Sequence, residues 1–255
     1  MIIILILVFI AYLYYESSIF TKNEIIIETE VKQNYRFLQI SDFHSNKNIN
    51  IQKLTQDISQ LNIDIIVLTG DIISRSDTHF NTSLKLIDAL NLLDIPIYYV
   101  YGNHELENEN IDTFTMELIK RKVVILDNEI FQINEEITLV GINHNSNKNT
   151  VENLLVNSGL NIILSHIPTR ITNIHPKTPT IAISGHTHGG QVRLPIVGQI
   201  ITPEQPLFGG LDKGITIINE NLTLYIDSGM GNSALPLRTF NRVQYSILNI
   251  VPKKE

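Results

Sequence analysis

Five short polar blocks, each placed just after a run rich in Val, Ile, Leu or Tyr, constrain this chain more than any other feature. They are Asp42-Phe43-His44, Gly70-Asp71, Gly102-Asn103-His104-Glu105, Ser165-His166 and Gly185-His186-Thr187-His188-Gly189-Gly190-Gln191. Apolar runs of this kind are typical of buried strands, so each block is expected at the end of a strand. Carboxylate and imidazole side chains bind Mn, Fe and Zn. The blocks therefore predict a metal site built at the ends of several strands.

Strands and helices are expected to alternate through the first two thirds of the chain. Strands are expected at 35–41, 63–69, 97–101, 123–126, 137–140, 161–165 and 180–184, and helices at 49–61, 84–93, 111–120 and 151–156. This alternation indicates βαβ units. After Gln191, strands expected at 215–219, 222–226 and 243–250 predict a second sheet. We expect an α/β fold, a four-layer αββα sandwich of two mixed β-sheets flanked by helices, with the site beyond the carboxyl ends of the strands.

Composition excludes several kinds of site. The chain has 255 residues, 43% of them hydrophobic, which is enough for a full core. Its net charge of −7 excludes a broadly basic surface, so no nucleic-acid partner is expected and a nuclease is disfavoured. The absence of Cys excludes a disulfide framework and a thiolate metal site. Any metal must therefore be held by oxygen and nitrogen ligands.

Residues 1–20 stand apart from the rest of the chain. The segment MIIILILVFIAYLYY is apolar throughout and ends at Glu16, slightly short of the roughly 17–20 apolar residues that span a bilayer. We interpret residues 1–20 as an N-terminal membrane anchor or uncleaved signal, residues 21–34 as a linker with an edge strand, and residues 35–255 as the main domain. A cleaved signal peptide, or a buried strand or helix, is the alternative. Lys22, Lys32 and Arg36 follow the segment and weakly favour a cytoplasmic domain.

The spacing within the blocks suits a pair of divalent metals. A carboxylate has two oxygens and can bridge two ions that lie about 3.5–4 Å apart. Asp42 and His44 alternate by two, so on a regular strand both would face the same way and reach one metal. His186 and His188 have the same spacing and can divide between the two metals. Gly70 allows the backbone before Asp71 to approach the metals closely.

These motifs in this order resemble the calcineurin-like metallophosphoesterase family. The blocks Asp-x-His, Gly-Asp, Gly-Asn-His-Glu, His and Gly-His-x-His carry the resemblance, which extends from about Arg36 to the end of the chain. The run Gly-His-Thr-His-Gly-Gly-Gln-Val-Arg-Leu-Pro at 185–195 is similar to the membrane-associated, YkuE/YaeI-like phosphodiesterase branch. Residues 35–255 are therefore identified as a metallophosphoesterase domain.

The resemblance implies two divalent metal ions, with Mn expected first and Fe or Zn as alternatives. It implies a first metal held by Asp42, His44, Asp71 and His188, and a second held by Asp71, Asn103, His166 and His186. His104 and Asp71 are the implied catalytic residues. In this scheme His104 does not bind a metal, but stabilises the transition state or protonates the leaving oxygen. A metal-bridging hydroxide is the implied nucleophile.

The resemblance also implies the reaction, which is hydrolysis of a phosphodiester or pyrophosphate bond. The predicted anchor suggests a lipid-linked or envelope-associated substrate, although an anchor can also localise an enzyme whose substrate is soluble. A phosphomonoesterase, and a metal-loaded, non-catalytic scaffold or binding module of the same fold, are the alternatives. The scaffold is disfavoured because every expected ligand and His104 are present.

Three residues downstream of the metal blocks are candidates for substrate binding, namely Arg193, Arg238 and Asn232. A guanidinium binds phosphate oxygens bidentately, but each arginine is explained equally well as a structural ion-pair partner. By resemblance to exported members of the family, we expect the domain to be extracytoplasmic, against the weak count of cations. The sequence leaves the oligomeric state open.

Overall fold

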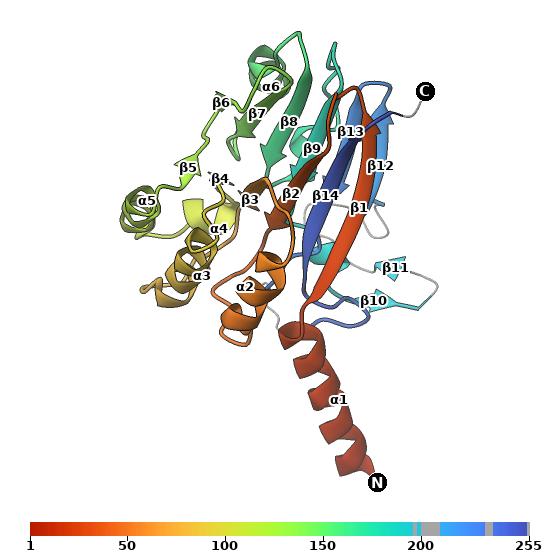
Figure 1. Ribbon diagram of the computed structural model, residues 1–255. Coiled ribbons are helices and arrows are strands. Elements are labelled where there is room, and N and C mark those ends of the chain that lie inside the picture. The colour runs from red at the N-terminus through yellow and green to blue at the C-terminus, as the bar shows by residue number, and fades with distance from the viewer. Residues whose placement is uncertain (196–197, 200–209, 233–236, 254–255) are drawn as a thin grey trace.

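Two six-stranded mixed β-sheets form the body of the protein, and helices cover their outer faces (Figure 1). The computed structural model describes residues 1–195, 198–199, 210–232 and 237–253. Over these residues the layers follow the order helix, sheet, sheet, helix. The predicted αββα sandwich is therefore confirmed.

The first sheet has the strand order β1-β14-β2-β3-β4-β5. Its strands are β1 (Thr21–Thr29), β14 (Gln244–Pro252), β2 (Tyr35–Ile40), β3 (Ile65–Thr69), β4 (Ile97–Val100) and β5 (Val124–Ile125). Strands β2 to β5 run parallel to one another, whereas β14 pairs antiparallel with β2 and parallel with β1. Residues 21–29 thus form an edge strand of this sheet.

The second sheet has the strand order β12-β13-β9-β8-β7-β6. Its strands are β12 (Gly214–Asn219), β13 (Leu222–Ile226), β9 (Thr180–Ser184), β8 (Leu160–Ser165), β7 (Ile137–Ile142) and β6 (Glu129–Gln132). Strands β7, β8, β9 and β13 are parallel, and the two outer strands are antiparallel to their neighbours. A separate short antiparallel ribbon consists of β10 (Arg193–Leu194) and β11 (Gly198–Gln199).

The helices flank these sheets on both sides (Figure 1). They are α1 (Ile2–Ser18), α2 (Ile51–Ser59), α3 (Asn81–Asn91), α4 (Asn103–Leu106), α5 (Ile111–Lys120) and α6 (Lys148–Leu154), with 3-10 turns η1 (Pro168–Arg170) and η2 (His188–Gly190). Helices α2, α3 and α5 pack on the first sheet, and α6 packs on the outer face of the second sheet.

Strand β3 shows why continuous apolar runs specify this sandwich. Successive side chains of a strand point to opposite faces of its sheet. Ile66 and Leu68 therefore pack against α2, α3 and α5, whereas Ile65 and Val67 pack between the two sheets. Full burial of such a side chain contributes about 1.5–3 kcal/mol. A strand with both faces covered must be apolar at every position, as β3 is until Thr69.

Helix α1 differs from the expected membrane-spanning segment in its length and in the burial of its last turn. It projects away from the two sheets (Figure 1). Its 17 residues extend about 26 Å at 1.5 Å per residue, less than the roughly 30 Å of a hydrocarbon core, and Glu16, Ser17 and Ser18 are buried against the protein body. Among the described residues, no helix combines the length and the apolar character needed to cross a bilayer. The structure therefore does not support the predicted transmembrane helix.

Two further elements were not expected from the apolar pattern. Strand β6 lies at the edge of the second sheet and all its residues are exposed, so its sequence lacks the signature of a buried strand. The β10–β11 ribbon has only two residues in each strand, which is too short for any periodicity to show.

Candidate metal centre

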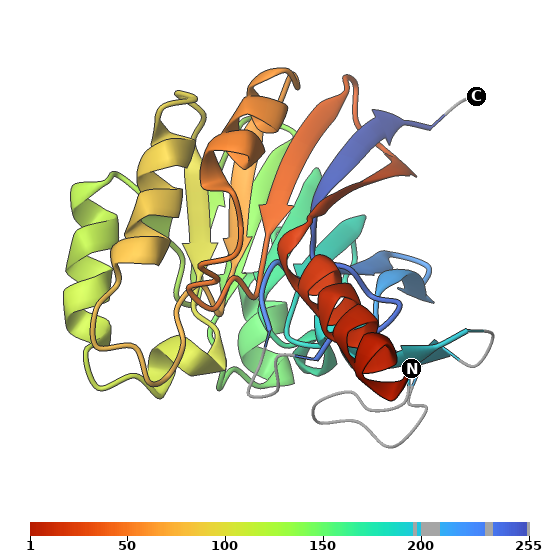
Figure 2. The same ribbon diagram turned by 90° about the horizontal axis from the view of Figure 1, so that it is seen from below.

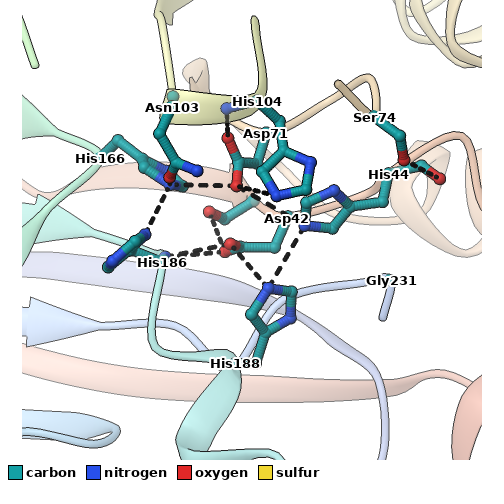
Figure 3. Close-up of polar contacts among 12 residues, drawn as sticks. Asp42, His44, Asp71, Ser74, Asn103, His104, His166, His186, His188 and Gly231 are labelled. Carbon is teal, nitrogen blue, oxygen red and sulfur yellow. Dashed lines mark hydrogen bonds and ion pairs between the residues drawn. The ribbon is translucent and has the colours of Figure 1, made fainter. Parts of the chain in front are cut away.

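Seven polar side chains meet beyond the carboxyl ends of strands from both sheets (Figure 3). Asp42 and His44 follow β2, Asp71 follows β3, Asn103 follows β4, His166 follows β8, and His186 and His188 follow β9. Since β2, β3 and β4 are neighbours in one sheet and β8 and β9 in the other, their ends converge at one end of the sandwich. The structure thus brings all seven predicted metal ligands together.

The first group of metal-binding side chains is Asp42, His44 and His188, which are all buried. One nitrogen or oxygen atom from each lies within 4.8 Å of those of the others. The Nε2 atoms of His44 and His188 are 3.3 Å apart, and His188 Nε2 is 3.5 Å from Asp42 Oδ1. A single cation can therefore contact all three side chains.

The second group is Asp71, His166 and His186, which are also buried. His166 Nε2 lies 3.3 Å from Asp71 Oδ2 and 3.2 Å from His186 Nδ1. Asn103 adds a neutral oxygen to this group, because its Oδ1 is 3.2 Å from His166 Nε2. His186 and His188 thus belong to different groups, as the family resemblance implies.

Asp71 lies between the two groups. Its Oδ2 is 3.6 Å from His44 Nε2 and 3.3 Å from His166 Nε2. The same oxygen is 4.0 Å from His104 Nε2, and Asp71 Oδ1 accepts a hydrogen bond of 2.8 Å from the backbone N–H of His104. This carboxylate is therefore placed to join two metal positions and the candidate catalytic histidine.

The backbone at the site is turned rather than extended. Left-handed φ angles occur at Asp42 (50°), His44 (47°), Asp71 (54°), His186 (71°) and His188 (50°). Residues other than glycine rarely adopt this conformation, which tends to gather at functional sites. Asp42 and His44 share a metal position because the loop after β2 curls, and the expected reason, the alternation of side chains on a strand, is wrong.

Glycines allow the loops of the site to approach one another. A Cβ atom at Gly102 would lie 2.1 Å from Asp71 Oδ1. Gly70 has a φ of +81°, and a Cβ atom there would lie 2.6 Å from Gly102 N and 2.8 Å from His166 Nδ1. Any side chain at either position would push the loops that follow β3 and β4 apart.

Glu105 holds the loops after β3 and β4 together from inside the protein. Its Oε2 accepts hydrogen bonds from the backbone N–H groups of Asp71 and Gly102, each at 2.8 Å. Its Oε1 accepts from Ile72 N at 2.6 Å and from Ile73 N at 3.1 Å. Burial, followed by the Asp71 carboxylate, raises the pKa of Glu105 to about 7, although the backbone donors lower it. The side chain supports the loops and does not face the metal positions.

The donor set fits divalent cations. Burial lowers the pKa of His44 and of His186 to about 3, and that of His188 well below its usual value, although Asp71 raises all three. These imidazoles are therefore neutral and have lone pairs for a metal. Burial also lowers the pKa of His166, but the Asp71 carboxylate raises it to about 10. His166 must therefore lose a proton when it binds a metal.

His104 stands at the edge of the site on α4, next to Arg75, which lies outside the five polar blocks of the sequence. Arg75 Nη2 lies 3.0 Å from His104 Nε2, and Arg75 Nη1 forms an ion pair of 2.7 Å with Glu107. Burial lowers the pKa of His104, Asp71 raises it and Arg75 lowers it, so His104 is mostly neutral at neutral pH. The Arg75 side chain is 52% exposed and is available to a substrate. Its position shortly after Asp71 is the only sequence signal for this role.

The three predicted substrate contacts lie around His188. Arg238 is fully buried and donates to the carbonyl groups of Gly231 and Ser228 at 2.6 and 2.7 Å. Its Nη2 is 3.3 Å from His188 Nδ1, and its Nε donates to Asn232 Oδ1 at 3.2 Å. Burial lowers the pKa of Arg238 to about 10, so the guanidinium stays charged at neutral pH. It supports the loop behind His188 and is not open to a substrate.

Arg193 is engaged in a similar way. Its Nη1 pairs with Asp212 and donates to the carbonyl of Gly189 at 2.8 Å. Arg193 and Asn232 thus contact the loops near His188, and their contacts among the described residues do not reach the metal ligands.

Comparison with known proteins agrees with this geometry. The sequence model of the calcineurin-like phosphoesterase family matches residues 35–190. Metallophosphoesterases YkoQ and YkuE of Bacillus subtilis are 25% and 24% identical to the chain, over 96% and 85% of this chain and 97% and 79% of those proteins. UDP-2,3-diacylglucosamine pyrophosphatase LpxG of Chlamydia muridarum is 25% identical over 77% of this chain and 78% of that protein. Since the family match covers more than half of the chain, the protein belongs to the calcineurin-like phosphoesterase family and is a phosphoric ester hydrolase.

Proposed function

We propose that this protein uses two divalent metal ions to hydrolyse a phosphodiester or pyrophosphate bond. The position of Asp71 carries the proposal, because its carboxylate lies between the two buried groups and contacts the backbone of His104. Two metal positions that share a carboxylate are the arrangement by which proteins clamp a phosphoryl group. The mixture of carboxylate, amide and imidazole ligands suits Mn, Fe or Zn, and we propose Mn²⁺.

In this proposal the metal ligands, His104 and Arg75 each have a separate role in hydrolysis. When bound, the two cations supply Lewis-acid polarisation of the phosphoryl group and lower the pKa of water. Asp42, Asp71, Asn103 and the four histidines His44, His166, His186 and His188 would hold the cations, and the burial of the carboxylates and these histidines excludes bulk water. His104 lies beside Asp71, whose carboxylate favours the imidazolium form of the ring, and in that form it is placed to protonate the departing oxygen. Arg75 presents a guanidinium next to His104 and is placed to bind a non-bridging phosphate oxygen.

For the substrate we propose a lipid-linked diphosphate or diester. LpxG, which is similar to this chain over most of both sequences, has a name that describes a pyrophosphatase of a diacylated sugar nucleotide. The exposed apolar side chains of residues 2–10 in α1 are consistent with contact with lipid. We place the domain outside the cytoplasm by its resemblance to exported proteins. Protease accessibility in intact cells tests that placement, and protection from added protease would contradict it.

The experiment that tests the proposed reaction is a metal-reconstitution assay on the full-length chain. The protein is stripped of metal with a chelator and receives Mn²⁺, Fe²⁺, Zn²⁺ or Mg²⁺ singly. Three substrates are compared, namely bis-p-nitrophenyl phosphate, p-nitrophenyl phosphate and a diacylated sugar-nucleotide diphosphate. His104→Ala is the test variant, and His175→Ala is the matched control because His175 is exposed and lies outside the metal groups.

We expect Mn²⁺-dependent cleavage of the diester or the diphosphate. Loss of general acid catalysis in His104→Ala should reduce turnover by roughly 10²- to 10⁴-fold, whereas His175→Ala should match wild type. A preference for the monoester would replace the proposal with a phosphomonoesterase. Failure to cleave any of the three substrates with two metals bound would contradict the catalytic assignment and favour a metal-loaded scaffold.

A further inference from the structure

The last turn of α1 is part of the structure that supports the metal centre. Glu16, Ser17 and Ser18 are each only 5% exposed, although most residues nearer the N-terminus of the same helix are exposed. Figure 2 shows this end of α1 running into the body of the protein. It lies between the loop that carries His44 and the loop behind His188, and these two histidines belong to the same group of metal-binding side chains.

On one side, Glu16 reaches the loop behind His188. Its carboxylate Oε2 accepts a hydrogen bond of 2.7 Å from the backbone N–H of Asn241, and its backbone carbonyl accepts one of 2.9 Å from Val243 N. The Asn241 side chain in turn donates to the backbone carbonyl of His188 at 2.5 Å. Only one residue therefore separates the Glu16 carboxylate from the backbone of a candidate metal ligand.

On the other side, the same turn reaches the loop that carries His44. The side-chain amide of Asn46, a residue of that loop, donates to Ser17 O and to Met230 O, each at 3.0 Å. The backbone N–H of Asn46 donates to Phe43 O at 3.0 Å. Asn46 thereby fixes the end of the loop that presents Asp42 and His44.

Charge complements these hydrogen bonds. Burial disfavours the charged form of the Arg238 guanidinium, and the carboxylates of Asp42, Asp227 and, to a smaller extent, Glu16 favour it. Arg238 donates to Asn241 O at 3.3 Å and lies 3.3 Å from His188 Nδ1. A neutral residue at position 16 would leave this buried cation with less compensation.

We propose that the last turn of α1 positions the metal ligands His44 and His188, with Glu16, Asn241 and Asn46 as the positioning residues. The inference rests on the proposed function, since it treats both histidines as metal ligands. Groups that orient metal ligands from behind are worth about 10- to 100-fold in metal affinity. The N-terminal helix is then a structural component of the metal centre.

The test is titration of the chelator-treated, full-length chain with Mn²⁺ alone, followed by calorimetry. Glu16→Ala removes the acceptor and the charge, whereas Glu16→Gln keeps an oxygen that can accept from Asn241 N. Asn46→Ala removes the contact on the other side of the turn. Glu28→Ala is the control, because Glu28 is an exposed glutamate on β1. Thermal unfolding of each metal-free variant is measured in parallel.

We expect the wild-type chain to bind two Mn²⁺ ions. Glu16→Ala and Asn46→Ala should each weaken one of the two binding events by at least about tenfold, with the other event within about threefold of wild type. Glu16→Gln should restore most of the lost affinity, and Glu28→Ala should behave as wild type. This selective loss separates positioning of one site from general destabilisation.

Other results would overturn the inference. Wild-type affinity for both ions in Glu16→Ala and Asn46→Ala would show that the last turn of α1 does not position the ligands, and would leave the proposed function intact. Equal weakening of both events, together with a lower melting temperature of the metal-free protein, would assign the contacts to folding alone. A wild-type chain that binds fewer than two Mn²⁺ ions would instead contradict the proposed function itself.

Discussion

Replacement of Glu105 by Gln tests whether one buried carboxylate holds the metal-binding loops in place. Glu105 is fully buried and accepts four backbone hydrogen bonds of 2.6 to 3.1 Å. Gln has nearly the same shape but only one accepting oxygen. Two of the four bonds can therefore persist, and the other two N–H groups must face an amide NH₂ group that has no lone pair to offer.

The size of the effect follows from this geometry. A buried donor without a partner costs about 1–3 kcal/mol, so two such donors cost about 2–6 kcal/mol. The substitution also removes a buried charge, which offsets part of this loss, and we expect a net destabilisation of about 2–4 kcal/mol. For a chain of this size each kcal/mol lowers Tm by roughly 2–4 °C. The expected fall in Tm is therefore roughly 5–15 °C.

The assay combines stability and turnover. Thermal unfolding of the metal-free protein is followed by circular dichroism at pH 8, above the pKa of about 7 to which burial raises Glu105. Turnover of the diester with Mn²⁺ should fall by about 10²-fold if displacement of the loops moves Asp71 by as little as 1 Å. Glu109→Gln is the control, because Glu109 is exposed on a nearby loop and should change stability by less than about 0.5 kcal/mol. Wild-type Tm and turnover in Glu105→Gln would refute the reasoning.

Three further outcomes are expected. Asp71→Ala should lose both bound metals and all turnover, since its carboxylate lies between the two groups; retained turnover with metal bound would contradict the shared role. Arg75→Ala should raise KM by about 10- to 100-fold, the equivalent of roughly 1.5–3 kcal/mol for a charge-assisted bond, and a fall in kcat with unchanged KM would argue against phosphate binding. Burial lowers the pKa of His166, but Asp71 raises it to about 10, so Mn²⁺ binding at pH 7 should release a proton and should strengthen as pH rises. Calorimetry in buffers of different ionisation enthalpy measures that proton, and His166→Asn should not release it.

Local patterns explain why much of the fold was predictable. The apolar runs before Asp71 and His186 are typical of strands buried on both faces, and β3 and β9 are buried at every position. The helix expected at 111–120 has those bounds in the structure. Exposed elements such as β6 lack this signal, because nothing in their sequence must avoid water. The burial of the last turn of α1 was not predicted, because an apolar run does not show where the protein body begins to bury the chain.

The sequence by itself determined the buried strands, the order of the layers and the chemical types of the ligands, because each depends on short segments and their periodicity. The family resemblance implied how those ligands divide between two metal positions, but only the tertiary structure decided how the backbone presents them, since left-handed backbone at residues such as His44 and His188 turns them off the path of a regular strand. The tertiary structure also decided which residues support the loops of the metal centre. The contacts of Glu105 with the loop after β3, and of Glu16 with the loop behind His188, join residues whose proximity depends on packing of distant segments.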